Sequence, residues 1–458
     1  MIEKAITYLE EKGAKFYDVR LEKKSHLSIN IINGEIRSIS DIHSTGLSIR
    51  VHMGGGWGYA STTNFSWESI KSACDHAFKL AKVLSERNKT SIELHPISIS
   101  ETRKAEVLIN PKNVDLSEKL EISFNFDSAM RNYSEKIVNS NVIYRESIFE
   151  FSLMNSAGAD LSWEEIRVGI IGYPVAMEEG KLQYSFESIS GTGGFEIIKN
   201  SDLEEKGAEI AKEAVDLLSA TKPPSGLITV IADPSVSGVL AHEVMGHASE
   251  ADEIIKKRSF LTGKVGEIVA SDLITMVDDG TVKRAYGSIP YDSEGTPSSR
   301  TIIIDRGIYK GYMHSLETAA VMGTQPTGNG RAQDFNRRVF VRMTNTFFER
   351  GEWRLEEIIE DTQEGLLALK SLGGMEDPVG GGFETKVLMG YVIRNGEKQE
   401  LVRGFTLSGK ALEILKTVDA VSKDFKLESG FCGKGEEDYV PVSTGGPYIR
   451  AKILVGGG

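Results

Sequence analysis

Residues 228–251 read ITVIADPSVSGVLAHEVMGHASEA, and this segment predicts a buried strand, a tight turn and a helix. The apolar run 228–232 is typical of a strand. Asp233 suits the N-cap position, and Pro234 suits the first helical turn, where its missing N–H costs nothing. Apolar side chains then recur at helical spacing, at Val236, Val239, Leu240 and Val244.

The predicted helix carries His242, Glu243 and His247 in the pattern H-E-x-x-x-H. Two imidazoles beside a carboxylate are the residues that a catalytic zinc ion needs, because the imidazoles bind the metal and the carboxylate handles the proton of a water molecule. The alternative interpretation places two histidines on the surface of an amphipathic helix. The strand and turn that precede the helix favour the metal site.

The motif is one residue longer than H-E-x-x-H, and this length has a structural consequence. In a regular α-helix, residue i+5 is rotated by roughly 140° from residue i, whereas both ring nitrogens must come within about 2.1 Å of one ion. A π-type turn with an i→i+5 hydrogen bond brings the fifth residue back under the first. Gly246 is the residue that would permit such a distortion. We therefore expect a bulged, bent or prematurely ended helix between His242 and His247.

Length and composition describe a globular chain with an acidic surface. Its 458 residues suffice for two or three domains, and its hydrophobic (40%) and charged (26%) contents are ordinary. The net charge of −13 disfavours nucleic acid or an anionic membrane as the main partner, and no apolar run reaches the ~18 residues that a membrane span needs. Cys74, at a buried-looking helical position, and Cys432 form no disulfide framework, so we predict a cytoplasmic protein.

The order of predicted elements indicates an α+β fold in three parts. Residues 1–110 combine an antiparallel sheet with helices on one face, and residues 111–222 form a middle α+β segment. Residues 223–458 form a β-rich, barrel-like domain that carries the H-E-x-x-x-H helix. The stretch 221–226, TKPPSG, breaks the chain between the last two parts.

Apolar periodicity also predicts individual elements. In the first part it indicates helices at 1–12 and 67–85, and Asn33-Gly34 is a strong hairpin signal. The strands predicted there are 17–22, 26–32, 35–40, 45–52 and 57–61. In the C-terminal part, 355–364 and 407–421 are the helices that we expect among many short strands.

A catalytic zinc ion takes three protein ligands and keeps one position open, so a third ligand must come from elsewhere in the chain. Cys432 lies between Gly430 and Gly433, in a stretch that predicts a tight, accessible loop. A thiolate in that setting is a suitable soft ligand. The alternatives are Glu250, Asp252 and His314. The residues alone leave this choice open.

Six stretches of the C-terminal half resemble the TldD/PmbA family. They are HEVMGHASEAD (242–252), YDSEGTPSSRTIIIDRGIYKGYM (291–313), PTGNGRAQ (326–333), RMTNTFFERGE (342–352), GFTLSGKALEILKTVD (404–419) and CGKGEEDYVPVSTGGPYIRAKILVGG (432–457). The resemblance implies a zinc metallopeptidase in which His242, His247 and Cys432 bind Zn2+ and Glu243 is the catalytic acid/base. It also implies a dimer, either with a TldE/PmbA-like sister subunit that lacks the motif or with a second copy.

The predicted activity is hydrolysis of peptide bonds in unfolded or small peptides and proteins. We expect a peptide to dock as an added strand on an exposed β edge near the motif helix, a mode that recognises backbone more than side chains. Tyr312, His314 and backbone N–H groups are open candidates for the oxyanion donor. Two rival functions are a zinc amidohydrolase acting on a small molecule and a non-catalytic scaffold subunit of a TldD/TldE-type complex. In the scaffold, zinc would be structural and would have four protein ligands.

Overall fold

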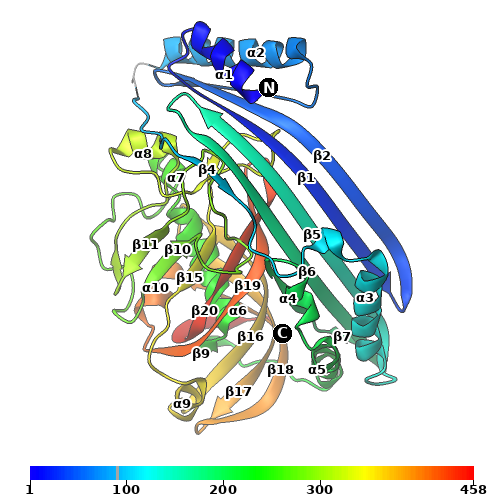
Figure 1. Cartoon of the computed structure of the whole chain (residues 1–458). Coiled ribbons are helices and arrows are strands. Elements are labelled where there is room, and N and C mark those ends of the chain that lie inside the picture. Colours follow the sequence, from blue (N-terminus) through cyan, green and yellow to red (C-terminus); the bar gives the residue numbers. More distant parts are fainter. Residues whose placement is uncertain (89–91, 458) are drawn as a thin grey trace.

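The computed structural model of the chain describes residues 1–88 and 92–457. Within these residues the fold is α+β and contains two large sheets, and Figure 1 shows the long N-terminal strands beside the C-terminal half. This confirms the predicted fold class. Among the described helices, none combines the length and the apolar character that crossing a bilayer requires.

The first sheet has eight strands in the described part of the chain, in the order β3-β2-β1-β5-β6-β4, with β7 and β8 also paired to β6. Its pairs are antiparallel except for β4 with β6. The strands are β1 (Phe16–Ile32), β2 (Glu35–Met53), β3 (Gly56–Thr62), β4 (Ser100–Arg103), β5 (Ile137–Asn155), β6 (Asp160–Glu178), β7 (Lys181–Tyr184) and β8 (Glu187–Thr192). Because β1 pairs with β5, this sheet runs across residue 110, and the division into domains at that residue stays a prediction.

Several predicted strands are parts of longer ones. The predictions 17–22 and 26–32 fall in the single strand β1, and 35–40 and 45–52 fall in β2. Polar residues interrupt the apolar pattern of β1, but β2 and β5 pair with it on both sides and satisfy its backbone whatever the side chains are. The hairpin prediction is confirmed, since Asn33 (φ 51°) and Gly34 (φ 77°) link the two strands with the positive φ values that a tight hairpin turn requires.

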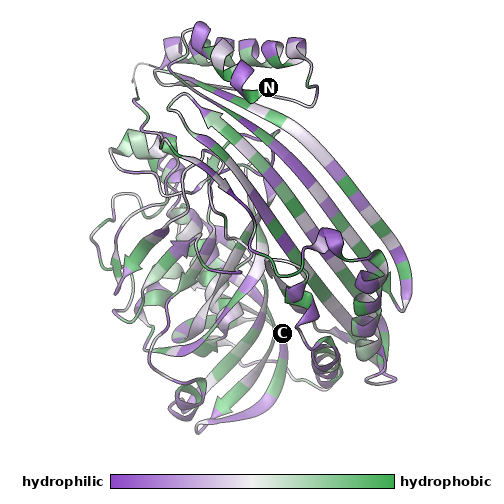
Figure 2. Cartoon of the chain, viewed as in Figure 1, coloured by the Kyte–Doolittle hydropathy of each residue, from purple (hydrophilic) through white to green (hydrophobic). Residues whose placement is uncertain are grey.

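Helices cover one face of this sheet, and Figure 2 shows hydrophobic and hydrophilic residues alternating along its long strands. The helices are α1 (Ile2–Glu11), α2 (Trp67–Arg87), η1 (Pro111–Asn113), α3 (Leu116–Arg131), α4 (Glu196–Lys199) and α5 (Leu203–Asp216). One apolar cluster joins α1 and α2 to β1 and β2 around Leu9, Ile49 and Cys74, which confirms the core position of Cys74. A second cluster joins α3 and α5 to β1, β5 and β6.

The second sheet has ten strands among the described residues, in the order β12-β11-β10-β15-β20-β18-β17-β16-β9, with β19 paired to β20. Since β20 pairs with both β18 and β9, the strands β9, β16, β17, β18 and β20 form a closed ring, which is the predicted barrel-like architecture. The strands are β9 (Gly226–Ala232), β10 (Met276–Asp279), β11 (Arg300–Asp305), β12 (Ile308–Tyr309), β15 (Asn345–Phe348), β16 (Glu364–Asp377), β17 (Gly382–Arg394), β18 (Glu397–Lys410), β19 (Ala420–Lys434) and β20 (Glu437–Gly456).

Short elements complete the C-terminal half. They are α6 (Pro234–Val239), the π-helix η2 (Leu240–Gly246), α7 (Ala251–Ile255), α8 (Leu316–Met322), β13 (Gly330–Arg331), β14 (Phe340–Val341), α9 (Leu355–Glu360) and α10 (Ala411–Lys416). The predicted helix 407–421 is wrong over most of its length, because β18 continues to Lys410 and β19 begins at Ala420. Pairing with β17 and β20 overrides the local helical preference there.

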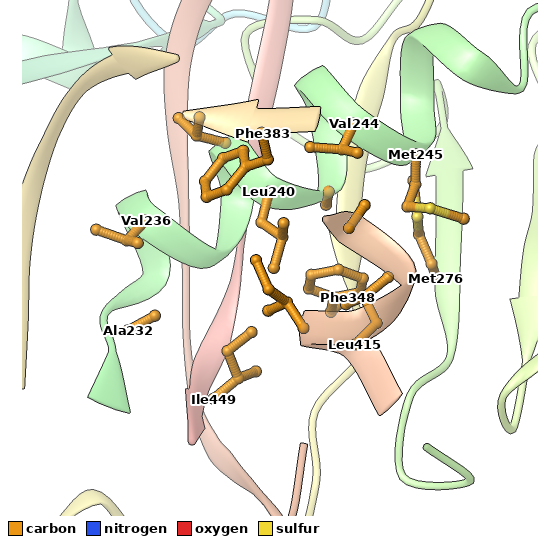
Figure 3. Packing of buried hydrophobic residues seen from close by; sticks show 14 of the residues in the cluster. Ala232, Val236, Leu240, Val244, Met245, Met276, Phe348, Phe383, Leu415 and Ile449 are labelled. Atoms are coloured by element: carbon orange, nitrogen blue, oxygen red, sulfur yellow. The ribbon is translucent and has the colours of Figure 1, made fainter. Parts of the chain in front are cut away.

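The motif helix lies at the centre of the largest apolar cluster. Val236, Leu240 and Val244, from the predicted apolar face, are each about 1% exposed. Figure 3 shows them packed with Phe348 of β15, Phe383 of β17, Leu415 of α10 and Ile449 of β20. Because burying one such aliphatic side chain contributes about 1.5–3 kcal/mol, this packing fixes the helix against the sheet.

Buried ion pairs and close packing join the first sheet to the C-terminal half. Arg50 of β2 donates to Asp18 Oδ2 at 2.5 Å and to Glu294 Oε1 at 2.8 Å, and all three side chains are buried. Gly46 lies against the ring of Phe335, where a Cβ atom would come within 2.1 Å of a ring carbon. Separating Arg50 from Asp18 or Glu294 would leave an uncompensated buried charge. These ion pairs and the close packing at Gly46 therefore hold the first sheet against the C-terminal half.

Gly58 tests the packing of α2 on β3. A Cβ at Gly58 would lie 1.8 Å from the Ala77 carbonyl oxygen, so the helix backbone must shift in Gly58→Ala. We expect the free energy of unfolding, measured by urea denaturation, to fall by about 2–3 kcal/mol. In the control variant Gly311→Ala the added Cβ would meet nothing within 4 Å, and its stability should be unchanged. Equal denaturation curves for the two variants would contradict the packing described.

Candidate metal centre

The π-helix η2 continues directly from α6 and ends at Gly246, and His247 is its C-cap residue. The His247 N–H donates to the His242 carbonyl, which is an i→i+5 hydrogen bond. The predicted distortion between the two histidines is therefore confirmed. Their ring centroids lie 5.2 Å apart with the ring planes at 80°, so the five-residue spacing brings both imidazoles to the same place.

Gly246 contributes to this turn in a way that the sequence did not predict. Its φ is not positive, so the conformational freedom of glycine is not what the π-helix uses. A Cβ at this position would lie 2.1 Å from Met343 Sδ. Gly246 therefore makes room for the neighbouring methionine side chain rather than for an unusual backbone conformation.

The start of α6 is anchored to two strands. Asp233 accepts a hydrogen bond from the Val236 N–H at 2.9 Å, as its predicted N-cap role requires, and another from the Lys370 N–H of β16 at 3.0 Å. Gly238 packs on β20, where a Cβ would lie 2.3 Å from the Gly445 nitrogen. The turn that bears the histidines is thus held by the strands around it.

Cys432 meets the histidines from a distant part of the chain. Its Sγ lies 3.4 Å from His247 Nε2, and donor atoms of His242, His247 and Cys432 all lie within 4.8 Å of one another. The prediction of an accessible loop is wrong: Cys432 is in β19 and only 3% exposed. Pairing of β19 with β20 buries the thiol beside the helix, although glycines flank it in the sequence.

Arg342 supports Cys432 through the backbone. This fully buried guanidinium donates to the Cys432 carbonyl at 2.5 Å and to Glu437 Oε2 at 2.6 Å. Glu437 also accepts from the Gln333 N–H at 2.8 Å, so it ties the start of β20 to the same network. Arg342 lies in the RMTNTFFERGE stretch, but the predicted site did not include it because a single arginine has no spacing signal.

Glu250 lies behind His247 rather than among the three donors. Its Oε2 is 3.2 Å from His247 Nδ1 and accepts from Lys434 Nζ at 2.9 Å, and Lys434 also pairs with Asp252 at 2.7 Å. Burial opposes ionisation of Glu250, but Lys434 and His247 outweigh it and hold its pKa at about 2. A carboxylate in this position fixes the orientation of an imidazole and the nitrogen that it turns toward a metal.

Attraction among the three donors outweighs the effect of burial. Burial alone would disfavour charge on each group. Because the thiol faces two imidazoles, however, the pKa of Cys432 lies well below its ordinary value, and the pKa values of His242 and His247 lie above theirs. These surroundings therefore favour the thiolate form of Cys432, which is the form that binds a metal.

The donor set can be tested against a zinc ion. Imidazole nitrogens and thiolate sulfurs are both zinc ligands, and catalytic zinc sites use three protein ligands, which is the number of donors gathered here. His242 Nδ1 is buried and has no hydrogen-bond partner within the described residues. Buried polar atoms usually have a partner, so this side chain is expected to interact with a further group such as a metal ion. These residues could therefore hold zinc.

Glu376 is a functional candidate that the sequence did not reveal. Carboxylate oxygens of Glu243 and Glu376 and a ring nitrogen of His247 lie within 4.8 Å of one another. Burial raises the pKa of Glu243 to about 7. The hydrogen bond to Glu376 also raises this pKa, whereas the nearby His242 and His247 lower it. The nearby glycines Gly373 and Gly374 are the local feature of the sequence that relates to this contact. In the structure a Cβ at Gly374 would lie 3.2 Å from Glu243 Cγ, so the glycine lets the strand approach Glu243 closely.

His314 and Tyr312, proposed as a ligand or as oxyanion donors, lie outside the group of three donors. His314 Nδ1 is 3.3 Å from Thr318 Oγ1, and burial lowers the pKa of this imidazole to about 4, which keeps it neutral. The Tyr312 ring contacts His314 edge to face, with the ring centroids 6.2 Å apart. Within the described residues, Glu250, Asp252 and His314 do not join the His242, His247 and Cys432 group.

Comparison with known proteins covers almost the whole chain. Residues 17–81 match the PmbA/TldA metallopeptidase domain 1, residues 109–220 its central domain and residues 225–457 its C-terminal domain. A metalloprotease from Methanocaldococcus jannaschii is 39% identical over 441 residues, which is 96% of each chain. A zinc metalloprotease TldD homolog from Saccharolobus solfataricus is 29% identical over 456 residues and 99% of each chain.

A solved structure shares the complete fold. TldE from Thermococcus kodakarensis superposes with a TM-score of 0.81 at 21% sequence identity, over 99% of both chains. Since all three domains match in order and a relative of 39% identity spans nearly the full length, this chain belongs to the TldD/PmbA family.

Proposed function

We propose that this chain is a zinc-dependent peptidase that hydrolyses peptide bonds of unfolded or small peptides and proteins. The observation that carries the proposal is the meeting of the H-E-x-x-x-H motif on a π-helix with a buried thiol 185 residues away in the chain. Relatives named metalloproteases support the same class of reaction. A bound zinc ion would supply Lewis acidity, which activates water near neutral pH and polarises a carbonyl group.

In this proposal His242, His247 and Cys432 hold the metal, and neighbouring residues position them or move protons. Glu250 accepts the Nδ1 proton of His247 and so keeps Nε2 directed toward Cys432. The Glu243 carboxylate takes the proton of the attacking water and delivers it to the leaving amine. A pKa of about 7 suits both steps, because the group is then close to equal populations of its two protonation states.

The substrate that we propose is an extended peptide that pairs with β16. This strand pairs with β9 only over residues 366–368, so residues 371–377 have one edge without a partner strand in the described part of the chain. The same stretch contains Gly374 and Glu376, which lie beside Glu243. A peptide paired along this edge would therefore pass the carboxylate, and backbone pairing would accept many side-chain sequences.

We further propose that the chain works as a dimer in the cytoplasm, either with a TldE/PmbA-like sister subunit or with a second copy. The fold shared with TldE supports an association between two similar chains. Two cysteines that are free and buried fit a reducing compartment. The net charge of −13 argues against nucleic acid or an anionic membrane as a partner.

The rival functions make different demands on the same residues. A structural zinc in a scaffold subunit would need a fourth protein ligand. Within the described residues, no further His, Cys, Asp or Glu joins the three donors, so zinc held by them would have three protein ligands, as in a catalytic site. An amidohydrolase would need a closed pocket for a small molecule, whereas the free edge of β16 favours binding of an extended peptide.

Replacement of the proposed acid/base tests the reaction. In Glu243→Gln, the amide cannot take the proton of water, so we expect kcat for cleavage of an unfolded peptide pool to fall by about 10²–10⁴-fold while zinc content stays unchanged. Glu121→Gln, which changes an exposed carboxylate of α3, is the control and should keep full activity. Undiminished cleavage by Glu243→Gln would remove Glu243 from this role.

Replacement of the proposed third ligand tests the metal centre. Because loss of a residue that only supports a ligand costs about 10- to 100-fold in metal affinity, Cys432→Ala should weaken zinc binding by more than about 100-fold. The measurement is zinc per chain after dialysis against a chelator of graded strength. Cys74→Ala removes the other buried thiol and should keep its zinc. Equal zinc retention by both variants would exclude Cys432 as a ligand.

A further inference from the structure

A small cavity lies between the first sheet and the C-terminal half. Its volume is about 50 Å³, which gives room for a few water-sized groups but not for a whole small molecule. Three of its lining residues, Phe151, Gln333 and Pro441, are half-buried, so solvent reaches the cavity. A ligand would therefore enter it with one end, as a side chain of a longer molecule does.

The carboxylate of Glu22 in β1 lines this cavity and lacks a partner. Glu22 is only 3% exposed, and its Oε1 atom has no hydrogen-bond partner within the described residues. Arg20, two positions earlier on the same face of the strand, donates instead to the carbonyl oxygens of Ser293 and Asp334. Burial raises the pKa of Glu22 to about 7, against the effect of Arg20. A buried carboxylate of this kind is costly unless an opposite charge or a hydrogen-bond donor meets it.

The other charged side chains that line the cavity are already paired. Glu165 accepts from Trp163 Nε1 at 3.0 Å and from Arg167 Nη1 at 2.7 Å. Arg331 donates to two backbone carbonyl oxygens, at 2.5 and 2.8 Å, and Asp292 accepts from three backbone N–H groups. Among the described residues of the cavity, Glu22 is therefore the group whose charge is left for a ligand, and that ligand must be a cation.

Aromatic rings form one wall of the cavity. Phe149, Phe151 and Trp163 stack in a row across β5 and β6, with successive ring centroids 5.8 and 4.8 Å apart. Tyr291 meets the ring of Trp163 edge to face at the end of this row. Such a wall suits the methylene groups that lead to a charged end in lysine and arginine side chains.

The cavity lies close to the candidate metal centre. Val440 lines the cavity and is the residue of β20 that pairs with Cys432 of β19. Arg331, also in the lining, donates to the carbonyl oxygen of Met343, whose sulfur packs against Gly246. A peptide with one bond at the metal centre could thus place a nearby side chain in the cavity.

We propose that this cavity binds the basic side chain, lysine or arginine, of a peptide substrate, with Glu22 as its ionic partner. The ammonium or guanidinium group meets Glu22 Oε1, and the methylene groups pack on Phe149 and Phe151. This preference rests on the proposed peptidase function and names a substrate class for it, peptides with a positive charge near the cleaved bond. Strand pairing accepts many sequences, so the cavity adds a side-chain preference that backbone recognition does not give.

Binding of matched peptides tests the preference for charge. The parent protein is Glu243→Gln with zinc, in which the proposed mechanism allows binding without cleavage. The probes are fluorescently labelled peptides with a single arginine, one peptide for each position, and the same peptides with citrulline, which has nearly the same shape and no charge. At one position or more, fluorescence anisotropy should show about 10-fold tighter binding of the arginine peptide, because hydrogen bonds between charged groups are the stronger ones. Equal affinities at every position, or no binding of any peptide, would overturn the proposal.

Two variants of this parent locate the site. Glu22→Gln should remove the difference between arginine and citrulline peptides. Glu150→Gln is the matched control and should keep it, because Glu150 lies between Phe149 and Phe151 in sequence but on the opposite face of β5, where it pairs with Lys112. A difference that persists in Glu22→Gln would place the cation on another surface and overturn the proposal.

Thermal unfolding of Glu22→Gln separates a binding role from a structural one. Its melting temperature should not fall, since the amide replaces a buried carboxylate that has no ionic partner. A marked fall would show that Glu22 already has a partner within the chain, and this too would overturn the proposal. Cleavage by the wild type is measured separately. A chain that discriminates the peptides without cleaving them would refute the peptidase alone, and a chain that cleaves without discriminating would refute the cation site alone.

Discussion

The i→i+5 hydrogen bond between the His247 N–H and the His242 carbonyl is the constraint on which the candidate centre depends. In an α-helix the two imidazoles would diverge, and no single ion could reach both. The π-turn brings them together at the expense of regular helical geometry. The distortion is held in place by its surroundings: Asp233 caps the start of α6, β20 packs against Gly238, and Val236, Leu240 and Val244 are buried in the largest apolar cluster.

Burial gives this turn its chemical character. A thiol and two imidazoles enclosed together interact strongly, because little water screens them. Their mutual attraction therefore exceeds the cost of burying charge and lowers the pKa of Cys432 well below its ordinary value. The same network extends outward through Glu250 and Lys434 on one side and through Arg342 and Glu437 on the other. Each charged group in it has an opposite charge beside it, as groups removed from water require.

Most strand edges in the second sheet are paired because five of its strands form a closed ring, but two strands of the molecule, β16 and β2, keep a free edge among the described residues. Five strands close into a ring and so have few free edges. The free edge of β16 lies beside Glu243, and the free edge of β2 lies on the outer border of the first sheet. Buried ion pairs around Arg50 join the two sheets, so both edges belong to one docked structure.

The sequence by itself determined the strand, cap and helix around Asp233, the distorted turn between the two histidines and the hairpin at Asn33, because local spacing and turn chemistry fix these features. The resemblance to a family pointed to Cys432, but spacing alone left Glu250, Asp252 and His314 open. Only the tertiary structure decided that the thiol is buried in a strand, that Glu250 lies behind His247, that Arg342 holds the Cys432 backbone and that Glu376 meets Glu243. It also reduced the predicted helix 407–421 to the short helix α10, with strand residues at both of its ends. The physical reason is the same in each case: these features depend on pairing and packing between residues far apart in the chain, and no local pattern records which distant strand will lie alongside.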